Sequence, residues 1–113
     1  MDKLSKVLNK IKSEVSKLDE TAEIIHFGST VRGDFNTESD IDIILLVDKK
    51  PANFQEEINL KYPLYEIEIE SGIIISPIIM TKSEWNFKKH KSIFLENVLE
   101  EGKLLRTMRI EFH

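Results

Sequence analysis

Apolar residues recur at helical spacing near the start of the chain and gather in short, dense runs further on. Residues 3–18 place an apolar side chain every three or four positions, which predicts an amphipathic helix. Its opposite face carries five lysines, which indicates a solvated surface or, as the alternative, a phosphate- or RNA-facing one. The runs 23–27 and 41–47 are rich in Ile, Leu and Val and are typical of buried strands.

Prolines interrupt the apolar pattern in the middle of the chain. Residues 52–70 begin as a helix, which Pro63 should interrupt or end. The alternation over 65–70 fits either a strand or the end of a helix. A third strand is expected over 73–80, and Pro77 places it at a sheet edge or a bulge because proline cannot donate a ladder hydrogen bond.

The last third of the chain has the pattern of helices followed by a strand. Ser83 is the expected N-cap of one or two helical segments that fill 84–101 and end at Gly102. The tail from Leu104 alternates at Met108, Ile110 and Phe112, which favours a last strand and an exposed edge. With a turn or short helix after residue 27, strands alternate with helical segments along the chain. The predicted fold is α+β, a mixed sheet with helices packed on it.

Composition narrows the class of protein. A chain of 113 residues with net charge −4 fits one domain, residues 1–113, and lacks the basic surface of a protein that binds nucleic acid directly. The absence of cysteine excludes disulfides, thiolate zinc sites and Cys nucleophiles. No apolar run approaches the ~20 residues of a membrane span. The lysine-broken N-terminus is unlike a signal peptide. We therefore expect a cytoplasmic protein without a membrane partner.

Candidate chemistry is concentrated after the first predicted strand. Strand alternation puts Asp40 and Asp42 on one face, where two adjacent carboxylates repel each other and favour a cation such as Mg²⁺. Gly28 lets a phosphate approach the backbone, and Ser29 and the amides after it can bind the phosphate oxygens. Arg32 adds a charged donor one turn further on.

This segment resembles the signature of the nucleotidyltransferase superfamily that includes DNA polymerase beta: Gly28-Ser29, ten residues, then Asp40-x-Asp42. The flanking Arg32-Gly33 and Ser39 resemble its small stand-alone branch, the minimal nucleotidyltransferases. The resemblance implies a nucleotidyltransferase fold and nucleotide binding by Gly28, Ser29, Arg32 and Ser39. It also implies that Asp40 and Asp42 are the catalytic and metal-binding residues, with Mg²⁺ or Mn²⁺ as cofactor and ATP or another nucleoside triphosphate as substrate.

One expected residue of this family pattern is missing. The family takes a third carboxylate from a later strand, and here Ser76 stands in that position within Ile75-Ser76-Pro77-Ile78. Glu66, Glu68 or Glu70 is the alternative source, although a run of alternating glutamates is more often a solvated edge. Loss of the third carboxylate weakens deprotonation and alignment of the attacking hydroxyl.

The resemblance also implies a reaction and a partner. The enzyme hypothesis is transfer of a nucleoside monophosphate, AMP by resemblance, to a hydroxyl of a HEPN-domain toxin, so that the chain acts as an antitoxin. The alternatives are a weakly active or inactive binding protein that neutralises its partner sterically, and a small α+β domain with an accidental motif. A homodimer through the tail is the other expected assembly.

Several further residues have two readings each. His26 is favoured as a core or edge histidine over a catalytic base, and Trp85 and Phe87 are expected to pack against the sheet. The basic cluster 88–91 is favoured as a solvated face over a site for phosphate or an acidic partner.

Overall fold

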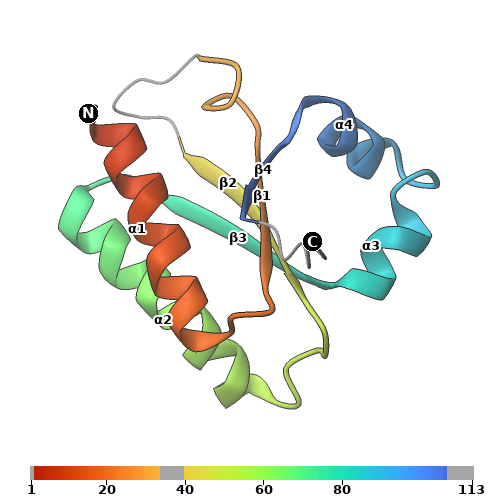
Figure 1. Cartoon of the computed structure of the whole chain (residues 1–113), viewed down its shortest axis with the longest axis horizontal. Helices are drawn as coiled ribbons and strands as arrows, with labels where there is room; N and C mark the ends of the chain where they lie inside the picture. Colours follow the sequence, from red (N-terminus) through yellow and green to blue (C-terminus); the bar gives the residue numbers. More distant parts are fainter. Residues whose placement is uncertain (1, 34–39, 107–113) are drawn as a thin grey trace, which may run out of the picture.

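The computed structural model describes residues 2–33 and 40–106, which form four helices and four strands (Figure 1). In chain order these elements are α1 (Lys3–Leu18), β1 (Glu23–Phe27), β2 (Ile41–Val47), α2 (Phe54–Ser71), β3 (Ile75–Thr81), α3 (Lys82–Lys88), α4 (Ile93–Glu101) and β4 (Lys103–Arg106). The helix predicted over 3–18 and the strands predicted over 23–27 and 41–47 are confirmed with these boundaries.

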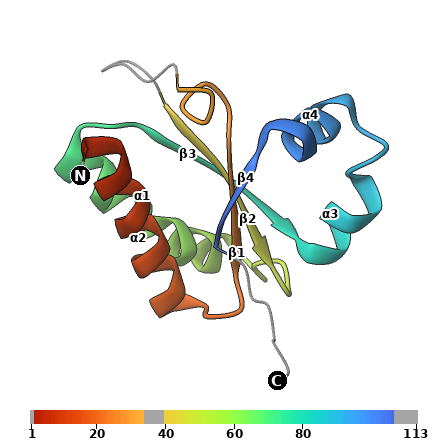
Figure 2. The ribbon, with the colours of Figure 1, turned by 45° about the horizontal axis from the view of Figure 1, so that its top comes forward.

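The strands form one mixed sheet in the order β3-β2-β1-β4. β2 runs parallel to β3 and antiparallel to β1, and β4 is antiparallel to β1. Helices α1 and α2 cover one face, and α3 and α4 lie against the other (Figure 1, Figure 2). The predicted α+β fold with a mixed sheet is confirmed.

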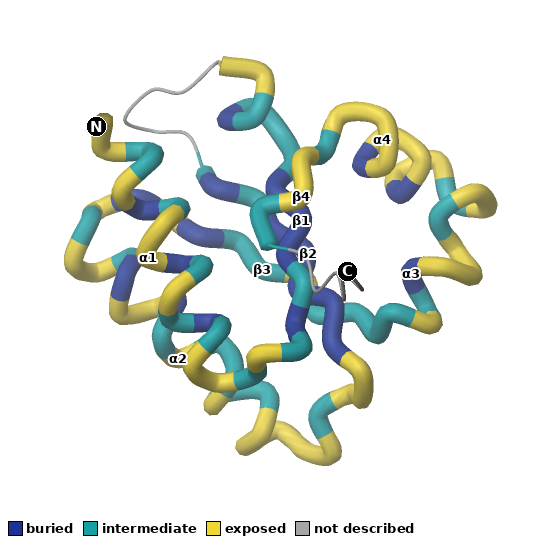
Figure 3. Tube along the Cα trace, viewed as in Figure 1, coloured by how far each residue is buried: buried dark blue, intermediate teal, exposed yellow. Residues whose placement is uncertain are grey.

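Strand β2 is the centre of the fold because both of its faces are covered. Ile41, Ile43 and Leu45 pack beneath α1 and α2, whereas Ile44 and Leu46 pack on the side of α3 and α4. These five side chains expose 2% of their surface or less, and every residue of β2 except Asp42 is buried (Figure 3). Burial of one such side chain stabilises the fold by about 1.5–3 kcal/mol. The core therefore fixes the position of the carboxylates where β2 begins.

Helix α2 continues through Pro63, so the prediction that this proline interrupts or ends the helix is wrong. The stretch 65–70, which fitted a strand or a helix, is helical. A proline inside a helix costs about 3 kcal/mol. Burial of Leu64 and Ile67 in the core beneath α2 offsets that cost, and Gly72 closes the helix in a left-handed C-cap.

Strand β3 lies at the edge of the sheet, as Pro77 predicted, and it pairs in continuous register with Pro77 opposite Ile43. The predicted N-cap at Ser83 is wrong, because Ser83 lies inside α3. The cap is Thr81, whose hydroxyl accepts from the Glu84 N–H while the Glu84 carboxylate accepts from the Thr81 N–H. This capping box satisfies two backbone donors at once and outcompetes a single serine.

The region 84–101 contains two helices, and the second ends at Gly102 as expected. Trp85 packs against the sheet, as predicted. Phe87 does not: its side chain is 65% exposed, and the Lys91 ammonium lies 3.5 Å from the centre of its ring. A cation above the ring gives this aromatic a partner without burial.

The connection from β1 to β2 begins with a turn rather than a helix over its described residues 28–33. A last strand, β4, runs over 103–106, whereas the alternation at Met108, Ile110 and Phe112 on which the predicted strand and its exposed edge rested lies outside the described residues. Within the described ranges, no helix is long and apolar enough to cross a membrane.

Candidate functional site

Gly28 lies directly against the carboxylate of Asp42. It follows β1, whose last residue, Phe27, is the register partner of Asp42 on β2. The φ angle of Gly28 is +85°, a conformation that side-chain-bearing residues rarely adopt. A Cβ built on Gly28 would lie 2.4 Å from Asp42 Oδ2, closer than real contacts allow. Both the turn and the approach to the carboxylate therefore require glycine at this position.

The turn after Gly28 is held by backbone hydrogen bonds and by one buried side-chain pair. The Val31 N–H donates to the Gly28 carbonyl at 3.2 Å, and the Arg32 N–H donates to the Ser29 carbonyl at 3.1 Å. Thr30 is buried, and its Oγ1 lies 2.6 Å from His26 Nε2 as a hydrogen-bond partner. The turn thus holds Gly28 and Ser29 beside the start of β2.

His26 supports this turn from the core side of the sheet. Its register partner is Ile43, which packs beneath α1 and α2, so the imidazole lies on the face opposite to Asp42. Burial, together with the nearby Lys103 ammonium, lowers the pKa of His26 below its ordinary value. His26 is therefore a buried residue that stabilises the turn through Thr30, which agrees with the prediction of a core or edge histidine.

Asp40 and Asp42 lie at the start of β2, where two carboxylates are close to each other. Asp42 alternates with the buried Ile41 and Ile43, so its side chain faces the side of the sheet on which α3 and α4 pack. Partial burial, and then the charge of Asp40, raise the pKa of the Asp42 carboxyl. A bound cation would remove this repulsion, and carboxylate oxygens are ligands suited to Mg²⁺. The donor set therefore fits a divalent metal completed by phosphate oxygens.

Ser76 is the register neighbour of Asp42 in the parallel pair of β2 and β3. Neighbours in such a pair point to the same face, so the serine hydroxyl lies on the same side as the Asp42 carboxylate. Across residues 2–33 and 40–106, no three His, Asp or Glu side chains gather closely enough to hold a metal. In the described structure, the position beside Asp42 therefore offers a hydroxyl rather than a third carboxylate.

Glu66, Glu68 and Glu70, the alternative sources of the third carboxylate, have environments other than the neighbourhood of Asp42. Glu68 Oε1 accepts from the Ile75 N–H at 2.9 Å, and Glu70 forms an ion pair with Lys10 of α1 at 2.7 Å. Glu66 is exposed and lines a shallow groove between α1 and α2. None of the three belongs to a metal-binding group within the described residues.

Arg32 and the α4 helix are joined beside the turn. Arg32 Nη1 donates to Glu101 Oε2 at 2.9 Å, and the rings of Phe27 and Phe94 meet edge to face with centroids 5.6 Å apart. Sequence reasoning singled out Arg32 but missed Glu101 and Phe94, since both lie more than sixty residues further along the chain. Ser39, the remaining predicted nucleotide-binding residue, lies outside the described residues.

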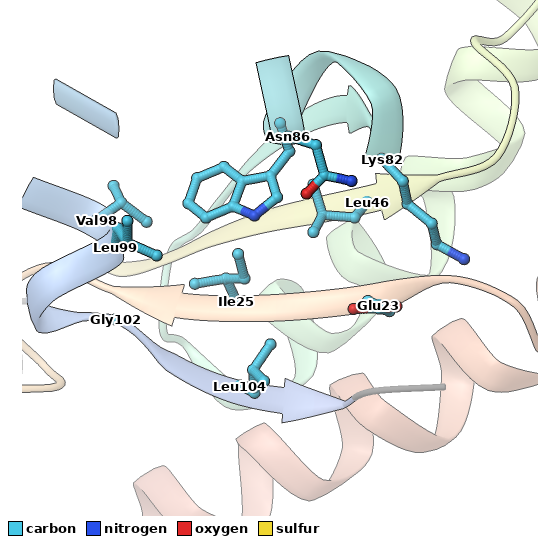
Figure 4. A pocket seen from close by; sticks show the side chains of 10 residues that line it. Glu23, Ile25, Leu46, Lys82, Asn86, Val98, Leu99, Gly102 and Leu104 are labelled. Carbon is cyan, nitrogen blue, oxygen red and sulfur yellow. The ribbon is translucent and has the colours of Figure 1, made fainter. Parts of the chain in front are cut away.

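A cavity of about 510 Å³ opens elsewhere on the same face of the sheet (Figure 4). Its lining includes Ile25 and Leu46 of the sheet, Val98 of α4 and Lys82 of α3. The register partner of Ile25 is Ile44, two residues beyond Asp42 on β2, so the cavity lies close to the carboxylate end of the strand, although neither Asp40 nor Asp42 lines it. No sequence motif pointed to this cavity.

Comparison with known proteins assigns this chain to a family. The sequence matches the nucleotidyltransferase domain family over residues 8–100. The chain belongs to this family. Its relatives include two proteins of Methanocaldococcus jannaschii, each named a putative protein adenylyltransferase. One is 40% identical over 83 residues, which is 74% of this chain and 76% of the relative. The other is 32% identical over 79 residues, or 68% and 79% of the two chains.

The fold comparison agrees with the sequence match. A crystal structure of a putative nucleotidyltransferase from Sulfolobus solfataricus superimposes with a TM-score of 0.52 and 22% sequence identity. The similarity covers 88% of this chain and 76% of the other. At that identity the likeness concerns the fold alone. The predicted nucleotidyltransferase fold is confirmed, and the chain is a nucleotidyltransferase-domain protein.

Proposed function

We propose that the chain binds a nucleoside triphosphate with Mg²⁺ or Mn²⁺ at the Gly28–Asp42 contact and transfers a nucleoside monophosphate to a hydroxyl. The observation that carries the proposal is the approach of Gly28 to the Asp42 carboxylate, where an added Cβ would lie 2.4 Å from Oδ2. This contact supports the proposal because the turn proposed to bind phosphate then lies beside the carboxylates proposed to bind the metal.

Each residue has a distinct part in the proposed reaction. Gly28, Ser29 and Ser39 bind the triphosphate, and Arg32 adds a charge-assisted bond to it. Asp40 and Asp42 are the catalytic and metal-binding carboxylates. The bound metal would neutralise charge on the phosphates and on the departing pyrophosphate. The acceptor oxygen attacks the α-phosphorus, the bond to the pyrophosphate oxygen breaks, and the acceptor proton passes to a base.

The acceptor is proposed to be a protein hydroxyl and the transferred group AMP. Two relatives are named as protein adenylyltransferases, which supports this choice. By family resemblance, the acceptor is a tyrosine of a HEPN-domain toxin, and the modification makes this chain an antitoxin. The proposed setting is the cytoplasm.

Ser76 favours a second candidate function. A hydroxyl beside Asp42 cannot serve as the carboxylate base at neutral pH, so the activation of the acceptor is weakened. The chain would then neutralise its partner by binding, with nucleotide as a structural ligand. In this form of the proposal the affinity for Mg-ATP remains, whereas transfer is slow or absent.

Two measurements separate these functions. Calorimetry with ATP, in the presence and absence of Mg²⁺, tests the site, and the paired substitution of Asp40 and Asp42 by Asn is expected to abolish metal-dependent binding. Equal affinity in the paired variant would refute the site. The intact mass of a co-expressed HEPN partner, measured with and without ATP, tests transfer. An added AMP supports the enzyme, and an unmodified but bound partner supports the steric antitoxin.

A further inference from the structure

The guanidinium of Arg32 already has an anionic partner in the protein. Arg32 Nη1 lies 2.9 Å from Glu101 Oε2, and both side chains are 49% exposed. Arg32 belongs to the turn that follows Gly28 and Ser29, and Glu101 is the last residue of α4. The ion pair therefore crosses from the proposed phosphate-binding turn to the end of a helix that packs on the same face of the sheet.

A carboxylate and a phosphate bind to the same N–H groups of this guanidinium. Both accept its N–H groups in a short, charge-assisted geometry, so each bond to Glu101 occupies a donor that a phosphate would use. The end of α4 adds further negative potential, because the carbonyl end of a helix carries partial negative charge. An incoming triphosphate therefore meets both a competitor for Arg32 and a local repulsion.

We propose that Glu101 is a competing residue that sets the affinity of the site for polyphosphate by holding Arg32 when no nucleotide is bound. The inference rests on the proposed function, since it takes Arg32 as a phosphate ligand. Nucleotide binding then exchanges the Glu101 carboxylate for a phosphate oxygen on Arg32. Glu101 lowers the affinity for nucleotide without touching it.

Release of Glu101 leaves the rest of α4 in place. Leu95 and Val98 bury this helix against the sheet, and the Phe27–Phe94 contact remains independent of the ion pair. The ion pair is half-exposed, and such pairs contribute little to folding. A variant that lacks the Glu101 charge is therefore expected to fold as the parent does, which makes its affinity interpretable.

The test is a double-mutant cycle followed by calorimetry with Mg-ATP. Glu101→Gln is expected to raise the affinity roughly two- to sixfold, the range in which an exposed ion pair competes for its cation. Glu100→Gln, which removes an exposed charge from the neighbouring position of α4, is the matched control and should change the affinity less. In an Arg32→Gln background, Glu101→Gln should have no effect.

The results of this test distinguish a failure of the inference about Glu101 from a failure of the proposed phosphate-binding role of Arg32. Unchanged or weaker binding in Glu101→Gln, or a gain equal to that of Glu100→Gln, overturns the inference. A gain that persists in the Arg32→Gln background also overturns it, because the effect would then not pass through Arg32. If Arg32→Gln alone leaves the affinity unchanged, the proposed phosphate role of Arg32 fails, and the competition fails with it.

Discussion

Replacement of Gly28 by alanine should weaken nucleotide binding in addition to lowering stability. Two consequences arise at this position. The φ angle of +85° strains any residue with a side chain, and the new Cβ collides with Asp42 Oδ2 at 2.4 Å. The colliding atom is the end of a side chain, so rotation of the carboxylate relieves the contact without moving the backbone. The strain remains, and the carboxylate loses its position in the site.

The two effects have different expected sizes. Left-handed backbone costs an alanine about 1–2 kcal/mol, which is the expected loss of unfolding free energy. Loss of one charged contact to the bound ligand is worth about 1.5–3 kcal/mol, or roughly a ten- to hundredfold weaker affinity for Mg-ATP. Urea unfolding measures the first effect, and calorimetry with Mg-ATP measures the second.

Gly72→Ala is the matched control for the strain. Gly72 has φ +76° at the end of α2, and no atom lies within 4 Å of a Cβ built on it. Its variant should lose a similar free energy of unfolding and retain Mg-ATP binding. If Gly28→Ala binds Mg-ATP within threefold of the parent protein, the contact between Gly28 and Asp42 is not part of a nucleotide site, and the argument fails.

Three further predictions concern catalysis, pH and assembly. Ser76→Asp restores a carboxylate beside Asp42 and should raise nucleotidyl transfer, by at most ~10²–10⁴-fold; a folded variant no faster than the parent would contradict this role for the position. Burial lowers the pKa of His26 below its ordinary value of 6.5, so the unfolded chain binds a proton at this residue more readily than the folded chain does. The free energy of unfolding should therefore decrease as the pH falls below 6.5. Urea unfolding at pH 7 and pH 5 should therefore show a smaller loss in His26→Gln, and equal losses would exclude this cause. Light scattering should detect a complex with a HEPN partner or a homodimer through the tail, and a monomer in both conditions, unchanged by deletion of 107–113, would refute both.

Helices and strands in which the spacing of apolar residues matches their burial could be predicted from the sequence. The helix over 3–18 and the strands over 23–27 and 41–47 are as expected because their apolar spacing agrees with their burial. The course of α2 could not be predicted, since the local preference of Pro63 is outweighed by core contacts that form only in the folded chain. The exposure of Phe87 was missed for a similar reason: its partner is the Lys91 ammonium rather than the sheet.

The residues of the candidate site could be predicted from the sequence, but their contacts could not. Gly28 and Asp42 could be singled out because the motif carries both within fifteen residues of chain. Their contact depends on the register that pairs Phe27 with Asp42, which the sequence does not state. The partner of Arg32 could not be foreseen at all, because Glu101 is 69 residues away and no periodicity links the two.

The position of Ser76 is supported by the pattern of its whole strand rather than by one pair of residues. On β3, Ile75 and Ile79 pack beneath α1 and α2, whereas Met80 packs on the side of Trp85. Because side chains alternate along a strand, this burial pattern alone places Ser76 on the side that Asp42 faces. A slip of one residue would bring Ile75 or Pro77 beside Asp42 and turn Ile75 and Ile79 away from the core beneath α1 and α2. Burial of the strand therefore accounts for a serine, and not one of the nearby glutamates, as the neighbour of the carboxylate.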